Sequence, residues 1–148
     1  RDYYASRGLG DVYKRQAQEM ARKTLENGGS TLMCKTAEDI ENITAKSAAE
    51  AAENGDETAK EVYRICGEKL GEGLAILADI LDPQAIIIGS IFARSGHLLK
   101  GSMEKALHRE ALSQTAGCRI IPAGLGEKIG DLASLGIALD AAANGGKA

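Results

Sequence analysis

The longest regular pattern of apolar and polar positions in this chain runs from Glu57 to Leu81. Apolar side chains recur there at steps of three and four residues, the spacing of a helix with one buried face. Asp56 precedes the pattern as a helix N-cap, and Pro83 follows it as a residue that cannot continue a helix. We predict a helix over 57–81 whose inward face consists of Ala59, Val62, Tyr63, Cys66, Leu70, Leu74, Leu77, Ile80 and Leu81.

Three glycines, Gly67, Gly71 and Gly73, lie inside this predicted helix. Each glycine in a helix interior costs about 1 kcal/mol relative to alanine. Three glycines in one helix therefore need a structural explanation, and we expect a neighbouring backbone to approach the helix closely there.

A short run after this helix, Ala85 to Ile88, is apolar at every position and rich in β-branched side chains. Such a run predicts a strand that is buried on both faces, as in parallel sheets. The strand is followed by Gly89 and Ser90, whose missing or small side chains would let a ligand approach the backbone. Ligands of open parallel sheets bind where a strand ends and the next turn begins.

The rest of the chain predicts further helices and one more strand. Before the long helix we expect a helix over 17–27, a helical turn over 36–42 and a helix over 44–53. After the strand we expect a helix from Gly96 or His97 to Arg109, a strand over 118–122, a glycine-rich turn over 124–130 and a last helix over 129–143. We expect Leu132, Leu135, Gly136 and Leu139 of the last helix to face inward.

The second half therefore forms a β-α-β-α unit, whose strands should be parallel with a right-handed crossover. Two strands do not complete a sheet, so their other neighbours should come from residues outside this sequence or from another chain. We divide the chain into a leader over 1–16, a helical segment over 17–55 and this unit with its preceding helix over 56–148. The leader holds three of the four tyrosines and resembles translated adapter sequence, so we expect it to be irregular or non-native.

Composition excludes several classes of protein. A chain of 148 residues suffices for one modest domain, and its net charge of −3 provides no basic footprint for nucleic acid. No run of about 18 apolar residues indicates a membrane span, and no signal peptide is visible, so we expect a cytoplasmic protein.

Few residues suggest chemistry. Cys34, Cys66 and Cys118 lack the spacing of a zinc site, and we expect them to be buried small hydrophobes. The two histidines, His97 and His108, are the available near-neutral bases, and we expect both on the surface. The residues alone therefore indicate a turn that could bind a nucleotide or an anion, and they do not indicate a set of catalytic side chains.

Gly124, Gly126 and Gly130 follow a predicted strand and open a predicted helix, as the glycines of a dinucleotide-binding loop do. The last glycine is one residue late, and the acidic residue expected about twenty positions further on would fall past the end of the sequence. We interpret this segment as a turn with close helix packing.

Several segments, taken in order, resemble the C-terminal half of the ROK family, which contains bacterial glucokinases, other sugar kinases and sugar-responsive repressors. The resemblance covers about Ile43 to Ala141. It rests on Gly55-Asp56, Leu70-Gly71-Glu72-Gly73-Leu74, Leu81-Asp82-Pro83-Gln84, the strand ending in Gly89-Ser90, Ile120 to Gly126, and Leu135 to Ala138.

This resemblance implies part of the C-terminal lobe of an actin/hexokinase-like (ribonuclease H-like) α/β fold. It implies an ATP- and Mg²⁺-dependent sugar kinase, most simply a glucokinase, in which Gly89, Ser90 and Ile91 lie on the adenosine side of the cleft. The phosphate-binding Asp-Gly-Gly-Thr turn, the sugar-binding Glu-x-Gly-His segment and the zinc cluster of the family are absent from this sequence. We therefore transfer no catalytic residue and no metal ligand to this chain, and expect it to be inactive alone.

The resemblance also implies partners: a sugar bound through the other lobe, and a second copy of the full-length protein in a homodimer, without nucleic acid or membrane. Two alternatives stay open. One is a sugar-sensing repressor of the same family that lacks its DNA-binding part, and the other is an unrelated α/β binding module.

Overall fold

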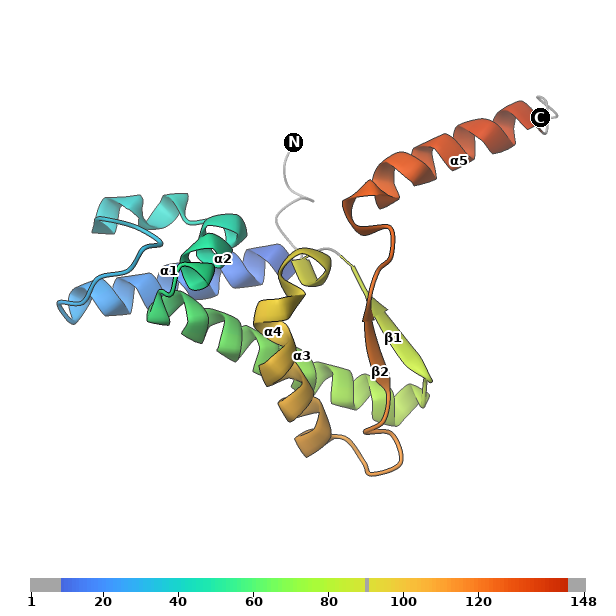
Figure 1. The fold of residues 1–148 in the computed structure, drawn as a ribbon, viewed down its shortest axis with the longest axis horizontal. Helices are drawn as coiled ribbons and strands as arrows, with labels where there is room; N and C mark the ends of the chain where they lie inside the picture. Colours follow the sequence, from blue (N-terminus) through green and yellow to red (C-terminus); the bar gives the residue numbers. More distant parts are fainter. Residues whose placement is uncertain (1–8, 90, 144–148) are drawn as a thin grey trace.

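The computed structural model describes residues 9–89 and 91–143, in which helices predominate and two strands form a small sheet (Figure 1). The elements are α1 (Leu9–Glu26), the 3-10 helix η1 (Ala37–Asn42), α2 (Ala45–Glu53), α3 (Glu57–Leu81), β1 (Ala85–Ile88), α4 (Ile91–Glu110), β2 (Arg119–Pro122), the 3-10 helix η2 (Gly126–Lys128) and α5 (Ile129–Ala143). This confirms the predicted α/β architecture and the bounds of the helix over 57–81.

The core lies where α3 crosses α4, and two glycines of α3 make that crossing close. A Cβ atom added to Gly67 would lie 2.6 Å from the carbonyl oxygen of Leu99. One added to Gly71 would overlap the carbonyl oxygen of Met103 and lie 2.7 Å from the Cβ of Ala106. The expected close approach of a backbone is thus confirmed for two of the three glycines, whereas Gly73 has no neighbour within 4 Å of such an atom.

The N-terminal helices cover the first half of α3. The rings of Tyr13 in α1 and Tyr63 in α3 lie with their centroids 5.9 Å apart, and both residues are buried. The Tyr63 hydroxyl donates a hydrogen bond of 3.0 Å to the carbonyl oxygen of Ala45. The leader over 1–16 was expected to be irregular or non-native. Its residues 1–8 lie outside the described residues, and 9–16 are not irregular but form the first turns of α1, because Tyr13 and Ala17 anchor this stretch in the core.

Asp56 joins the start of α3 to the preceding loop. Its carboxylate accepts a hydrogen bond of 2.7 Å from the Ala59 backbone N–H, which confirms the predicted N-cap. The same carboxylate accepts from the Thr31 hydroxyl at 2.8 Å and from the Leu32 backbone N–H. Only 9% of Asp56 is exposed, so a single buried carboxylate holds the helix and the loop together.

β1 and β2 pair in parallel, as predicted, with Ala85 opposite Arg119 and Ile88 opposite Pro122. The expectation that the first strand is buried on both faces is wrong for the described residues. Ile86 and Ile88 pack against the core, but Ile87, which points to the other face, is 70% exposed. No described element lies over that face to cover it.

The apolar side chains of the last helix are also more exposed than expected. Figure 1 shows α5 extending away from the other elements beyond η2. Leu132, Leu135 and Leu139, which we expected to face inward, are between 44% and 68% exposed. Gly136, expected inward with them, is exposed as well. The same correction applies to the end of α3, where Leu77, Ile80 and Leu81 lack a covering element among the described residues.

The helix after β1 begins earlier than predicted, at Ile91 instead of Gly96 or His97. Ser95 interrupts it with non-helical backbone angles (φ −120°, ψ 22°), so two helical pieces meet at a kink. The predicted start coincides with the second piece. The first piece is held by Phe92, which is 6% exposed and packs beside Gly96.

Candidate functional site

The turn between β1 and α4 carries the residues that the sequence assigned to a nucleotide. Gly89 directly follows β1 and Ile91 is the first residue of α4, while Ser90 lies outside the described residues. A Cβ atom added to Gly89 would meet only the Cβ of Ala123, at an ordinary distance of 3.8 Å. Its φ also lies outside the left-handed region. The fold itself therefore does not require glycine at this position.

A hollow of about 440 Å³ lies beside the first turns of α4, between that helix and α2. Such a volume falls in the range of small-molecule sites. From α4 it is lined by Arg94 and by Ser95, which is 7% exposed. From α2 it is lined by Ala45, Lys46, Ala49, Glu50 and Glu53. The hollow thus offers both signs of charge beside α4, the helix that follows the Gly89 turn.

Glu53, which lines this hollow, belongs to a pair that joins the two helices. The Nε2 atom of His97 in α4 lies 3.0 Å from a carboxylate oxygen of Glu53 in α2. Within α2, Lys46 lies 3.8 Å from Glu50. Both histidines are exposed, as predicted, and His108 bonds through Nδ1 to the carbonyl oxygen of Glu104 at 2.7 Å. His97 is therefore paired with a residue of the hollow, Glu53, whereas His108 belongs to the opposite end of α4.

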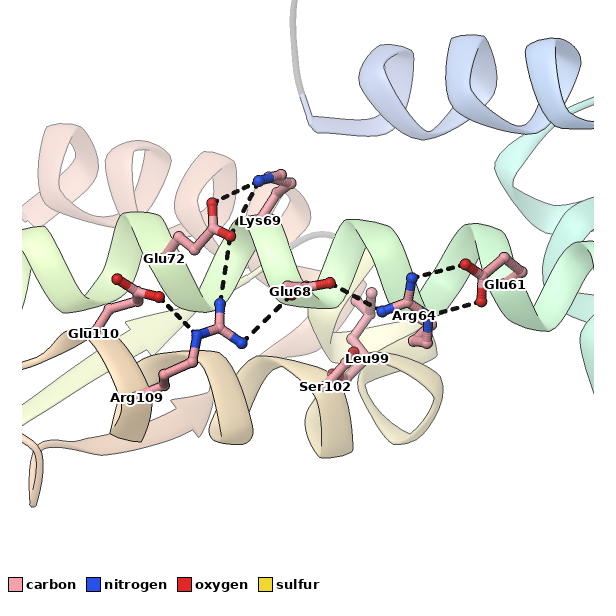
Figure 2. Close-up of polar contacts among 9 residues, drawn as sticks. All are labelled: Glu61, Arg64, Glu68, Lys69, Glu72, Leu99, Ser102, Arg109 and Glu110. Atoms are coloured by element: carbon pink, nitrogen blue, oxygen red, sulfur yellow. Dashed lines mark hydrogen bonds and ion pairs between the residues drawn. The ribbon is translucent and has the colours of Figure 1, made fainter.

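The most extended polar cluster lies on the outer face of α3 and α4, and Figure 2 shows that it is an ion-pair network. Glu68 accepts from Arg64 at 2.9 Å and from Arg109 of α4 at 3.4 Å. The hydrogen bond to Glu61 and then that to Glu68 raise the pKa of Arg64, and the Arg64 guanidinium lowers the pKa of Glu61. Each arginine is already paired with neighbouring carboxylates. We therefore interpret this cluster as a structural link between α3 and α4.

The three thiols differ in exposure. Cys34 and Cys66 are buried, as predicted, whereas Cys118 is half-buried, which corrects the expectation for that residue. Burial raises the pKa of the Cys66 thiol to about 11. Burial, with smaller contributions from the carboxylates of Asp39 and Asp56, also raises the pKa of Cys34. The neutral thiol is therefore favoured at both buried positions.

We expect alkylation by iodoacetamide at pH 8 to modify Cys118 first. With a pKa of about 11, Cys66 has roughly one thousandth of its thiol ionised at that pH, and only the thiolate reacts. Its rate should rise about tenfold per pH unit until the pH reaches that pKa. Peptide mass spectrometry after timed labelling measures the three rates. If Cys66 in the native protein were labelled as fast as Cys118, the prediction would be wrong. As a control, a Cys118→Ser variant should contain no rapidly alkylated thiol.

Residues 9–89 and 91–143 contain no cluster of three or more His, Cys, Asp or Glu side chains that could hold a metal ion. Within the same residues, no helix is both long and apolar enough to cross a bilayer.

The model of the ROK family matches residues 3–140, which is most of the sequence. The chain belongs to the ROK family. The ROK glucokinase from Streptomyces griseus, solved with glucose and AMPPNP, has a similar structure with a TM-score of 0.69 and 30% identity. That likeness covers 80% of this chain and 38% of the glucokinase chain.

Curated relatives include regulators as well. The DNA-binding transcriptional dual regulator NagC of Escherichia coli K12 is 30% identical over 73 residues, which are 49% of this chain and 18% of that protein. The DNA-binding transcriptional repressor Mlc of the same organism is 31% identical over 70 residues, which are 47% of this chain and 17% of Mlc. The matched segments of this ROK chain therefore span less than a fifth of NagC and of Mlc.

The sequence pointed to Gly89 but to none of the residues that α2 adds to the hollow. Lys46, Glu50 and Glu53 appear along the chain as an ordinary charged helix face. Only the packing of α2 against the start of α4 brings them beside Arg94. No local sequence pattern predicts that these two helices pack against each other.

Proposed function

We propose that this chain is part of an ATP-dependent sugar kinase of the glucokinase type, and that it supplies the adenosine side of the cleft. The main supporting observation is the Gly89 turn, where glycine is unnecessary for the fold yet leaves the backbone open just before α4, the helix that lines the hollow with Arg94 and Ser95. The glucokinase with a similar structure was solved with glucose and AMPPNP. By analogy, the nucleotide would approach Gly89, Ser90 and Ile91, with its nucleoside in that hollow.

The residues of the hollow fit a nucleoside chemically. Carboxylates of Glu50 and Glu53 can accept hydrogen bonds from hydroxyl or amino groups, and Lys46 and Arg94 can donate them. ATP would bring the phosphoryl group that is transferred to a hexose hydroxyl. Phosphoryl transfer depends on positioning and charge stabilisation from both sides of a cleft. We assign no Mg²⁺ ligand to this chain, and we expect it to be inactive alone, with the full-length protein cytoplasmic and homodimeric.

A second candidate function is sugar sensing by a repressor of the same family. The observation in its favour is the identity of 30% and 31% to NagC and Mlc, both DNA-binding regulators. The coding sequence upstream of Ala17 separates the candidates. A helix-turn-helix segment there favours the repressor, and a phosphate-binding Asp-Gly-Gly-Thr turn with a catalytic aspartate favours the kinase.

We expect the longer natural protein to release ADP from ATP in the presence of a hexose. A Gly89→Ala substitution should raise its KM for ATP at least tenfold, because the added methyl group would occupy the space at which the nucleotide approaches the backbone. A coupled assay over common hexoses measures both results. Sugar-independent ADP release, or none with any hexose, would remove the kinase assignment.

Gly117→Ala provides a matched control for this substitution. Gly117 has nothing within 4 Å of an added Cβ, so alanine fits there without a clash, as at Gly89, and it lies in the loop before β2. We expect its KM for ATP to equal that of the unchanged protein. If both variants lose activity equally, the effect of Gly89→Ala does not arise from the nucleotide.

A further inference from the structure

A second polar hollow, of about 420 Å³, lies against the last turns of α4. From that helix it is lined by Glu104, Leu107 and His108, and its other wall consists of residues 116–121, which end the loop after α4 and begin β2. None of these residues lines the hollow between α2 and the start of α4. The volume falls in the range of small-molecule sites, so this end of the fold has room for a ligand of its own.

The loop that forms this wall is anchored from α3. The Asp79 carboxylate accepts a hydrogen bond of 3.0 Å from the Leu112 backbone N–H, and it also accepts one from the Thr115 hydroxyl. Thr115 is 9% exposed, and its carbonyl oxygen accepts from the Cys118 backbone N–H at 3.0 Å. The backbone that carries Cys118 is therefore fixed before any ligand arrives, which lowers the entropic cost of binding there.

Cys118 supplies a nucleophile to the hollow. It is a free cysteine and half-buried, whereas Cys34 and Cys66 are buried. Its Sγ atom lies 4.0 Å from the Arg119 carbonyl oxygen, a long contact for a group that is a weak donor. The thiol is therefore accessible to a reagent that enters the hollow.

The charged groups around this thiol favour an anionic reagent. Among the described residues, no carboxylate pairs with the Arg119 guanidinium, and an arginine binds a carboxylate through two parallel hydrogen bonds. The Glu104 carboxylate, which also lines the hollow, lies 3.7 Å from the Lys100 ammonium. His108 donates from Nδ1 to the Glu104 carbonyl oxygen at 2.7 Å, which leaves its Nε2 atom for another partner. The hollow thus combines an unpaired cation with a thiol.

We propose that this hollow is a modification site, at which Cys118 forms a mixed disulfide with a small disulfide that carries carboxylates. The Cys118 thiolate attacks one sulfur of the small disulfide, and the old S–S bond breaks as the new one forms. The other half leaves as a thiolate and takes up the proton that Cys118 lost. The small disulfide is therefore the oxidant, and Arg119 pairs with a carboxylate of the half that stays bound.

This site does not depend on the proposed function, because neither a nucleotide nor a sugar takes part in the exchange. An accessible thiol by itself would exchange with small disulfides of either charge. The unpaired guanidinium adds a preference for the anionic ones, because it attracts them and holds the adduct. The charge of the reagent therefore separates a specific site from simple exposure.

The test compares two reagents on the 148-residue chain at pH 8 and low ionic strength. One is glutathione disulfide, which carries carboxylates, and the other is cystamine, a disulfide with ammonium groups. Peptide mass spectrometry measures the rate at which each modifies Cys118. We expect the ratio of the glutathione rate to the cystamine rate to be at least ~5-fold higher in the native chain than in urea. Equal ratios in the native and unfolded chains would overturn the proposal.

Substitutions assign the preference to one side chain. Arg119→Gln should reduce the native ratio to that of the unfolded chain, whereas Arg119→Lys, which keeps the charge, should retain most of the preference. Lys105→Gln is the matched control, because it removes one positive charge from α4 at a residue that lines another hollow, with Arg64 and Glu68. It should leave the ratio unchanged. A ratio that falls equally in Arg119→Gln and Lys105→Gln would assign the effect to overall charge and overturn the site.

Discussion

Gly71→Ala should destabilise the protein by about 2 kcal/mol, although alanine is the better helix former. The new methyl group would overlap the carbonyl oxygen of Met103 and press on the Cβ of Ala106 at 2.7 Å. Both contacts belong to the backbone or first side-chain atom of α4, so neither can move aside without separating the helices. Urea unfolding followed through the tyrosine signal of the core measures the change.

Gly73→Ala is the matched control, since it places the same substitution two residues further along α3. No atom lies within 4 Å of the added Cβ, so only the helix preference remains. We expect Gly73→Ala to stabilise the chain by about 1 kcal/mol, opposite in sign to Gly71→Ala. Shifts of the same sign in the two variants would show that the close crossing of α3 and α4 does not determine stability.

Asp56→Ala should cost about 3 kcal/mol, the second large effect that the structure predicts. The substitution removes the N-cap of α3, worth about 1 kcal/mol. It also leaves the Leu32 N–H and the Thr31 hydroxyl without their acceptor, and a buried donor without a partner costs about 1–3 kcal/mol. Denaturant unfolding at fixed protein concentration measures the sum.

Asp39→Ala is the corresponding control, because Asp39 caps a helix at the surface. Its carboxylate accepts from the backbone N–H and the hydroxyl of Thr36 at 3.2 and 3.0 Å, in solvent and without a loop to hold. We expect a loss below about 1 kcal/mol. A cost at Asp56 no larger than that at Asp39 would mean that the buried carboxylate merely caps the helix.

Local sequence patterns predicted the helices and strands well where the deciding contacts join residues that are close in sequence. Asp56 caps α3, the predicted helical turn forms over Ala37–Asn42, and the apolar run at Ala85 became a strand parallel to β2. These features depend on contacts within a few residues, which periodicity and cap chemistry report directly. The start of α1 was missed because the tertiary contact of Tyr13 with Tyr63 holds it.

Burial was predicted less well than secondary structure. Periodicity identifies which face of a helix is apolar, but not whether a neighbour is present to cover it. Leu77 and Leu135 continue correct apolar patterns, yet both are exposed in the part of the chain that the structure describes. The hollow between α2 and α4 was missed for a related reason, because only the packing of these two helices brings Glu50 and Arg94 to the same hollow.

The isolation of α5 has a consequence for how this chain unfolds. α5 contacts η2, and none of its residues belongs to the buried core around the crossing of α3 and α4, so its unravelling leaves that core intact. The chain is then not one cooperative unit, since its last helix can melt first while Tyr13 and Tyr63 keep their native surroundings. Helix content and tyrosine environment would follow separate melting curves, and they would merge only once another part of the protein encloses α5.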